Sequence, residues 1–170
     1  MARALLLTGR PGCGKTTLLR KVVGPLGSRA GGFYTAEVRE AGRRVGFEVV
    51  TLDGERAVLS HVRFSSPYRV GQYGVGTEAL ERVGVAALRR ACRLGLLVVV
   101  DEIGKMELFS DAFRQAVLEA LQQERMVLGT IMASPHPWAD QIKRDPHVRL
   151  LLLTRETWEE AYRTAVRWVE

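Results

Sequence analysis

The most informative segment of the sequence is Gly9-Arg10-Pro11-Gly12-Cys13-Gly14-Lys15-Thr16. It matches the pattern G-x-x-x-x-G-K-[ST], in which glycines allow several backbone N–H groups to converge on one anion. A short apolar run, residues 4–8, precedes it, and residues 15–23 carry apolar side chains at helical spacing. The stretch is therefore expected to join a strand to a helix, whose N-terminus adds partial positive charge. This context predicts a phosphate-binding loop.

The residues of this loop have separate expected roles. Lys15 is expected to reach the β- and γ-phosphates of a nucleotide and to take part in catalysis. The Thr16 hydroxyl is expected to ligate Mg²⁺. The residues expected to bind the nucleotide in this part of the chain are Gly9, Arg10, Pro11, Gly12, Cys13, Gly14, Lys15, Thr16 and Thr17.

Length and composition predict a single globular domain over residues 1–170. The chain has 170 residues, of which 46% are apolar and 26% charged, and these proportions are ordinary for a globular protein. No apolar run approaches the roughly 20 residues that span a bilayer, and residues 4–7 are too few for the apolar core of a secretory signal. We therefore expect a cytoplasmic monomer without membrane contact. The net charge of +6 favours anionic partners such as nucleotides or nucleic acid.

The rest of the chain changes from strand to helix periodicity and back. Residues 32–62 alternate in hydrophobicity and predict a β-meander that is antiparallel at least in part, whereas residues 65–76 have no regular period and predict a loop. The other expected elements are helices over residues 77–93, 109–121 and 157–169, and strands over residues 96–100, 126–132 and 150–153. This order predicts an α/β fold with a mostly parallel central sheet flanked by helices, and with the antiparallel meander inserted after the first βα unit.

Two acidic residues follow the most apolar of these strands. Residues 96–100 are continuously apolar, as in a parallel strand buried on both faces, and they lead directly into Asp101 and Glu102. Ligands in such folds bind at the carboxyl ends of strands, so these acids should face the same crevice as the phosphate-binding loop. Asp101 is expected to hold Mg²⁺, largely through water. Glu102 points to a different side and is expected to accept a proton from the water that attacks the γ-phosphate.

Two further cations could contact the phosphates or the transition state. Lys105 follows the acidic pair and could neutralise developing charge, or it could form a solvated surface pair with Glu107. Arg69 lies in the glycine-rich segment 65–76 and could act as an arginine finger from within the same chain. Long loops inside compact domains are often functional, which makes this segment a candidate part of the site.

Several motifs together resemble those of a known family. The most specific is the octet Asp101-Glu102-Ile103-Gly104-Lys105-Met106-Glu107-Leu108. The others are Leu7-Thr8-Gly9 with Lys15-Thr16-Thr17, Gly32-Phe33-Tyr34-Thr35, Arg43-Arg44-Val45-Gly46-Phe47, Arg69-Val70-Gly71-Gln72-Tyr73 and Leu128-Gly129-Thr130-Ile131. Over nearly the whole chain, the sequence resembles the THEP1-type nucleoside-triphosphatases, also called cancer-related nucleoside-triphosphatases, which are P-loop NTPases.

This resemblance implies an activity, a fold class and a set of contacts. The activity is Mg²⁺-dependent hydrolysis of ATP, GTP and other nucleoside triphosphates to the diphosphate and phosphate, with broad base tolerance. The fold class is the additional-strand class of P-loop NTPases, which carries a catalytic glutamate after the metal-binding aspartate. In that class the strand at residues 126–131 would lie between the two motif strands. The nucleotide-site residues of the octet would be Asp101, Glu102, Ile103, Gly104 and Lys105.

Two alternatives share parts of this pattern. A nucleotide or small-molecule kinase uses the same loop and metal but must exclude water and bind a second substrate under a lid. A nucleic-acid-dependent ATPase would account for the positive charge, although the arginines of residues 82–93 fall on the polar side of their helix and can be simply solvated. We favour NTP hydrolysis because Glu102 suits the activation of water, and we do not favour a nucleic-acid partner, although one is possible.

Overall fold

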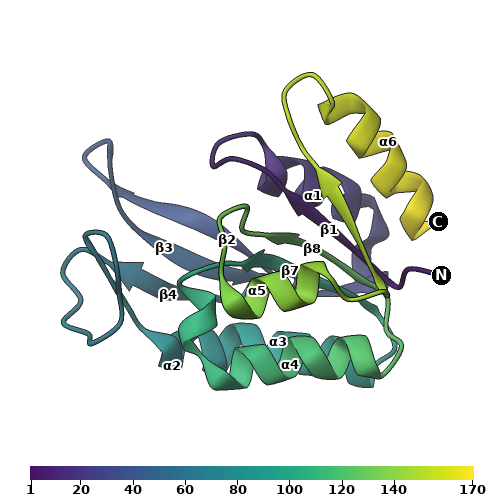
Figure 1. Ribbon diagram of the computed structural model, residues 1–170. Coiled ribbons are helices and arrows are strands. Elements are labelled where there is room, and N and C mark those ends of the chain that lie inside the picture. The colour runs from purple at the N-terminus through teal and green to yellow at the C-terminus, as the bar shows by residue number, and fades with distance from the viewer.

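A computed structural model describes the whole chain, Met1–Glu170. The protein is built on one nine-stranded sheet with the strand order β5-β6-β4-β3-β2-β7-β8-β1-β9. Figure 1 shows this sheet flanked by helices, with the two chain termini at the same end of the molecule. The predicted α/β fold with its antiparallel meander is confirmed.

Four strands at one side of the sheet run parallel to one another. They are β1 (Ala4–Thr8), β7 (Leu97–Ile103), β8 (Val127–Ile131) and β9 (Val148–Leu152). β8 pairs with β1 on one side and with β7 on the other, so it lies between the two motif strands, as the family resemblance implies. Because the strands run parallel, the loop after β1 and the acids near the end of β7 lie at the same edge of the sheet.

The meander continues this sheet. Its strands are β2 (Ala30–Glu40), β3 (Arg43–Thr51) and β4 (Arg56–His61). β2 pairs antiparallel with β3, and β3 with β4, while the first residues of β2 pair in parallel with β7. β2 therefore belongs to both parts of the sheet. Figure 1 shows the β2–β3 hairpin projecting beyond the parallel strands.

The segment predicted as a loop, residues 65–76, contains two short strands. β5 (Arg69–Val70) and β6 (Tyr73–Val75) form a hairpin, and β6 also pairs with β4. The prediction of a loop without regular structure is therefore wrong for these residues. Strands of two and three residues are too short to show a period in the sequence.

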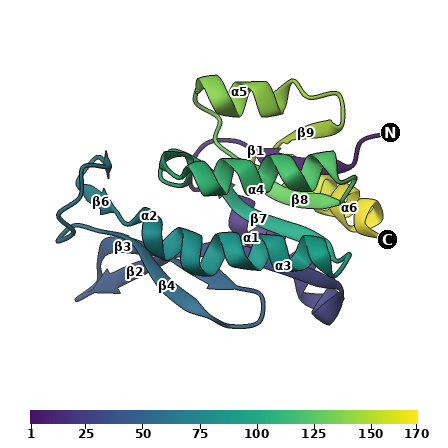
Figure 2. The ribbon, with the colours of Figure 1, turned by 90° about the horizontal axis from the view of Figure 1, so that it is seen from below.

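Helices cover both faces of the parallel strands. One face carries α1 (Lys15–Val23), a 3₁₀ turn (Gly24–Arg29) and α6 (Trp158–Val169). The other face carries α2 (Thr77–Ala79), α3 (Ala86–Arg93), α4 (Asp111–Gln122) and α5 (Pro137–Lys143). Figure 2, which shows the molecule from below, has α3 and α4 side by side in front of the sheet.

The helices largely agree with the sequence pattern, apart from the start of α4 and a short helix that the pattern does not show. A π-helical turn, Leu80–Val85, joins α2 to α3, so the predicted helix over residues 77–93 is one continuous segment. Phe109 lies in a 3₁₀ turn, Glu107–Phe109, and α4 begins only after Ser110, whose hydroxyl accepts a hydrogen bond from the Phe113 N–H at 3.1 Å. The sequence reasoning missed α5, because a helix of seven residues is too short to display a clear apolar face.

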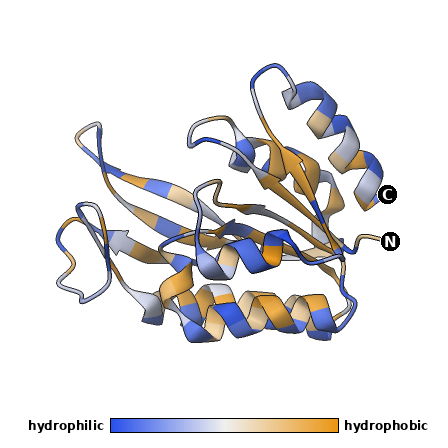
Figure 3. Ribbon diagram, viewed as in Figure 1, coloured by the Kyte–Doolittle hydropathy of each residue, from blue (hydrophilic) through white to orange (hydrophobic).

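Alternate side chains of the strands enter two hydrophobic cores. In β1, Ala4 and Leu6 pack towards α3, α4 and α5, whereas Leu5 and Leu7 pack towards α1 and α6. Figure 3 shows the strands mainly apolar and the outer surfaces of the helices mainly polar. Burial on both faces explains why these strands are continuously apolar in sequence. No helix has the length and hydrophobicity needed to cross a bilayer.

Candidate nucleotide site

The predicted phosphate-binding loop joins β1 to α1, as the sequence pattern requires. The Lys15 ammonium group donates a hydrogen bond to the Gly9 carbonyl oxygen at 2.7 Å and lies 3.4 Å from that of Arg10. Gly9 and Gly14 have φ angles of 155° and 93°. A Cβ atom at Gly9 would lie 2.6 Å from the Leu153 carbonyl oxygen, so the close packing of the loop requires glycine there.

Helix α6 holds the end of this loop. The indole N–H of Trp158 donates to the Gly14 carbonyl oxygen at 3.3 Å, and a Cβ at Gly14 would lie 2.9 Å from the same nitrogen. The Trp158 ring stacks on Tyr162 with 5.7 Å between centroids, and the Lys21 ammonium lies 4.6 Å from the Tyr162 centroid. The sequence reasoning missed Trp158, because nothing in the local pattern connects it to a loop 144 residues earlier.

Asp101 lies at the centre of the site. Its side chain is almost fully buried, with 1% exposed, and one carboxylate oxygen accepts a hydrogen bond from the Thr16 hydroxyl at 2.8 Å. The same oxygen accepts from the Thr35 N–H at 3.3 Å, and the other accepts from the Thr130 hydroxyl at 2.5 Å. The structure thus brings together Thr16 and Asp101, the two predicted Mg²⁺ ligands.

Thr35 and Thr130 are site residues that sequence reasoning did not assign. Thr35 lies in β2 and Thr130 near the end of β8, so the strands on both sides of β7 each contribute one hydrogen bond to Asp101. Both residues fall inside family motifs. The strand order is the only signal that could have placed them beside the acid.

Burial raises the pKa of Asp101 above its ordinary value, and the three hydrogen bonds and the Lys15 charge oppose this effect. The pKa of Glu102 is also raised, first by burial and then by the neighbouring Asp101 charge, while Lys15 lowers it. Unlike Asp101, the Glu102 carboxylate receives no hydrogen bond from the protein. It lies against Gly104, where an added Cβ would be 2.7 Å from Glu102 Oε1. Glu102 is therefore a carboxylate close to Lys15 with free hydrogen-bonding capacity.

The other predicted site residues differ in their surroundings. Arg10, Pro11, Gly12 and Thr17 are exposed, whereas Cys13 is half-buried in the loop. Ile103 is fully buried and its side chain packs in the core, so only its backbone remains available to a ligand. Lys105 is exposed.

Arg69 is not brought to the phosphate-binding loop. Its guanidinium group donates to the carbonyl oxygen of Gln72 at 2.9 Å, within its own hairpin, and to that of Phe64 at 3.3 Å, in the segment just before it. The strand that carries it, β5, is at one end of the sheet, whereas β1 is next to the other end. Its assignment as an arginine finger stays a prediction, and contact with a bound nucleotide would require this hairpin to move.

Comparison with known proteins identifies the family. A family model described as "NTPase" matches residues 4–166. The chain belongs to this NTPase family. Nucleoside-triphosphatase THEP1 of Thermotoga petrophila is 50% identical over 139 residues, which cover 82% of this chain and 77% of that protein. A human protein named cancer-related nucleoside-triphosphatase is 44% identical over 172 residues, covering 92% of this chain and 90% of the relative.

Members of the family with solved structures share the whole fold. The crystal structure of THEP1 from Aquifex aeolicus superposes with a TM-score of 0.91 at 37% identity, covering 98% of this chain and 99% of the other. The solution structure of a human cancer-related nucleoside triphosphatase gives a TM-score of 0.85 at 40% identity, covering 99% and 98% of the two chains. The fold implied by the sequence resemblance is thereby confirmed over the length of the chain.

Proposed function

We propose that this protein hydrolyses nucleoside 5′-triphosphates to the diphosphate and phosphate in a Mg²⁺-dependent reaction. The observation that carries the proposal is the hydrogen bond between Thr16 and Asp101, which joins the phosphate-binding loop to the acidic end of β7 and leaves Glu102 free beside them. The names of the relatives, which describe nucleoside-triphosphatases, support the same activity.

The residues at this point fit a magnesium ion. The Thr16 hydroxyl and the Asp101 carboxylate are oxygen donors 2.8 Å apart, and Mg²⁺ prefers oxygen ligands. No group of three or more His, Cys, Asp or Glu side chains is arranged to enclose a metal, and Mg²⁺ commonly binds through one or two protein ligands while keeping several waters. When bound, the ion would neutralise charge on the phosphate oxygens.

The protein's own groups then have defined tasks. The backbone N–H groups of residues 12–16 bind phosphate oxygens, and Lys15 turns from the Gly9 carbonyl towards the γ-phosphate. The oxygen of a water molecule bonds to the γ-phosphorus as the bond to the β,γ-bridging oxygen breaks, and the water proton passes to the Glu102 carboxylate. Burial raises the pKa of Glu102 towards neutral pH, and a general base is most effective when its pKa lies near the pH at which it works.

Broad base specificity forms part of the proposal. Every contact assigned above is to phosphate, metal or water, and none is to a base. Phe33, an aromatic residue next to the site, is fully buried and packs edge-on against Phe113 with 6.3 Å between centroids, so its ring cannot stack on a nucleotide.

Phosphate release from ATP, GTP, CTP and UTP, with and without Mg²⁺ and with no acceptor or nucleic acid, tests the proposal. We expect Mg²⁺-dependent release from all four nucleotides. Glu102→Gln should keep nucleotide binding and slow release by several orders of magnitude, because the amide accepts protons poorly. Lys15→Ala should lose both binding and release. Parental turnover in Glu102→Gln would eliminate Glu102 as the base.

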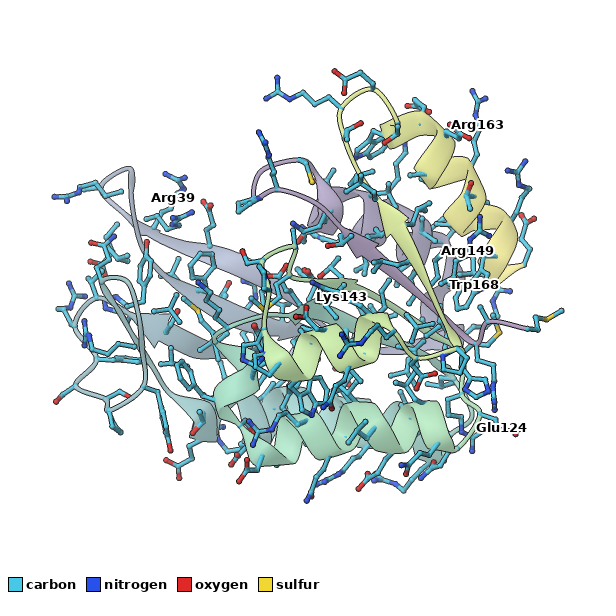
Figure 4. All side chains as sticks on the ribbon, in the orientation of Figure 1. Arg39, Glu124, Lys143, Arg149, Arg163 and Trp168 are labelled. Atoms are coloured by element: carbon cyan, nitrogen blue, oxygen red, sulfur yellow. The ribbon has the colours of Figure 1, made fainter.

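The same experiment separates the alternatives. Binding of nucleotide without phosphate release would indicate a missing acceptor or activator, as in a kinase or a nucleic-acid-dependent ATPase. For the second of these, the structure offers no single basic stripe. Figure 4 shows Arg39 on the projecting hairpin and Arg149 and Arg163 at the opposite end of the molecule. On α3, Arg89 and Arg90 are paired with Glu119 and Asp53.

A further inference from the structure

The side chain of Glu102 packs against the Cα atom of Gly104. A Cβ atom added at Gly104 would lie 2.7 Å from Glu102 Oε1, 3.0 Å from Cγ and 3.2 Å from Cδ. All three of these neighbours belong to the carboxylate end of the same side chain. The space that any larger residue would occupy at position 104 is therefore the space in which the Glu102 carboxylate lies.

Glycine is required at position 104 because a side chain would meet Glu102, and not because of a positive φ angle. Gly104 is not among the residues with positive φ, in contrast to Gly9 and Gly14 in the phosphate-binding loop. Its φ angle therefore does not itself disfavour alanine. The nearest neighbours of an added methyl group are all atoms of Glu102.

The backbone around Gly104 leaves little room for adjustment. The Gly104 carbonyl oxygen accepts a hydrogen bond from the Leu108 N–H at 3.0 Å, and the Ile103 carbonyl oxygen accepts one from the Met132 N–H at 3.0 Å. Ile103 is 0% exposed and anchors this segment in the core. The flexible partner in the contact is the Glu102 side chain, which no protein donor holds in place. A methyl group at position 104 would thus displace the carboxylate.

We infer that Gly104 is a positioning residue for the reaction: its missing side chain defines where the Glu102 carboxylate stands relative to Lys15 and Asp101. The inference rests on the proposed function, because it assigns Gly104 an effect that acts only through Glu102. Displacement of a catalytic group by about 1 Å can lower a rate by about 100-fold. The nearest neighbours of the added methyl group belong to Glu102 and not to the loop of residues 9–16, so we expect nucleotide binding to change little.

The test is the substitution Gly104→Ala, compared with the same substitution at Gly24. At Gly24 an added Cβ has no neighbour within 4 Å other than the adjacent residues, and φ is −49°. Because Pro25 follows, Gly24→Ala is expected to cost some stability, but as a control it should keep the parental rate and affinity. We expect Gly104→Ala to lower kcat by about 10- to 100-fold while the Kd for the nucleotide with Mg²⁺ stays within about twofold. A parental kcat in Gly104→Ala would overturn the inference.

A double-mutant cycle shows whether the effect passes through Glu102. In the Glu102→Gln background, adding Gly104→Ala should lower the remaining rate by no more than about twofold, because the displaced group no longer acts as a base. An equal fall in both backgrounds would overturn the inference. The cycle also separates the two proposals. A parental rate in Glu102→Gln would contradict the role of Glu102 as the general base. A parental rate in Gly104→Ala, with a slow Glu102→Gln variant, would contradict only the positioning role of Gly104.

Thermal unfolding covers the case in which Gly104→Ala does not fold. The Glu102→Ala substitution removes the atoms that the new methyl group would meet. If the Tm of Gly104→Ala is lowered, the double variant Glu102→Ala/Gly104→Ala should melt at the temperature of Glu102→Ala. A double variant that melts as low as Gly104→Ala would show that the methyl group clashes elsewhere, and it would contradict the inference.

Discussion

Glu107 is a buried carboxyl group that has no task in the proposed reaction. It is 4% exposed, and burial raises its pKa well above the usual 4.5, with the charges of Glu102 and Asp101 raising it further. The folded protein therefore keeps this proton to a higher pH than the unfolded chain does. The stability that the protonated group contributes is fully present below pH 4.5. It is lost as the pH rises towards the folded pKa, by about 1.4 kcal/mol per pH unit.

Substitution of Glu107 by glutamine should remove this pH dependence, because the amide has a similar size and is neutral at every pH. We expect the free energy of unfolding of Glu107→Gln, relative to the parent, to increase as the pH rises above 4.5 and to level off above the folded pKa. Urea denaturation between about pH 4 and about pH 9 measures the difference. A constant difference across this range would mean that Glu107 titrates alike in the folded and unfolded chains.

Among individual residues of the site, the sequence predicted some and missed others, because some contacts depend on long-range strand pairing. Thr16 and Asp101 belong to motifs that each follow a predicted parallel strand, which places both at the same edge of the sheet. The structure joins them by a hydrogen bond. Thr35 and Thr130 donate to the same carboxylate, but threonine is common and only the order of β2, β7 and β8 brings these two close to it. Their roles depend on long-range pairing, which a local pattern does not contain.

Among the elements, α6 supports the phosphate-binding loop through Trp158. Trp158→Ala would remove the ring that packs on Gly14 and the hydrogen bond to its carbonyl oxygen. We expect a loss of stability of about 2 kcal/mol and weaker nucleotide binding, whereas Trp158→Phe should retain most of both through ring packing. Urea denaturation and nucleotide titration measure the two effects.

Trp168 provides the matched control for this prediction. It lies near the other end of α6 and packs against the same core, and Figure 4 shows it at the end of the molecule near the chain termini. Trp168→Ala should lower stability and leave nucleotide affinity unchanged. Equal losses of affinity in Trp158→Ala and Trp168→Ala would contradict a specific role of Trp158 in supporting the loop.

The sequence predicted well those elements whose own residues show a clear local pattern of apolar positions and turns. β1 and α1 have the expected bounds, because a strand, a glycine-rich turn and an amphipathic helix follow each other without interruption. The missed elements are stabilised from elsewhere in the fold. Helix α5 buries Ala139 and Ile142 in a core built by distant strands and helices, and β6 forms by pairing with β4. Short segments of this kind have too few residues for a periodic pattern.

At the scale of the whole molecule, the meander and the parallel strands share both a strand and a core. β2 pairs with β7 on one side and with β3 on the other. One hydrophobic cluster contains Leu6 of β1, Phe33 of β2, Val49 of β3 and Leu59 of β4. Opening the meander would therefore expose side chains on which the packing of the parallel strands depends, and this favours a single cooperative unit over two separate ones.

We accordingly expect one unfolding transition for the whole chain. In native-state hydrogen exchange, the slowest amides of β3 should open with the same free energy as those of β8, because both would require global unfolding. Calorimetry should give equal calorimetric and van't Hoff enthalpies. A lower opening free energy in β3 would show that the meander unfolds first. It would then be a separate unit, and the contact that β2 makes from Thr35 to Asp101 would be lost before the parallel core opens.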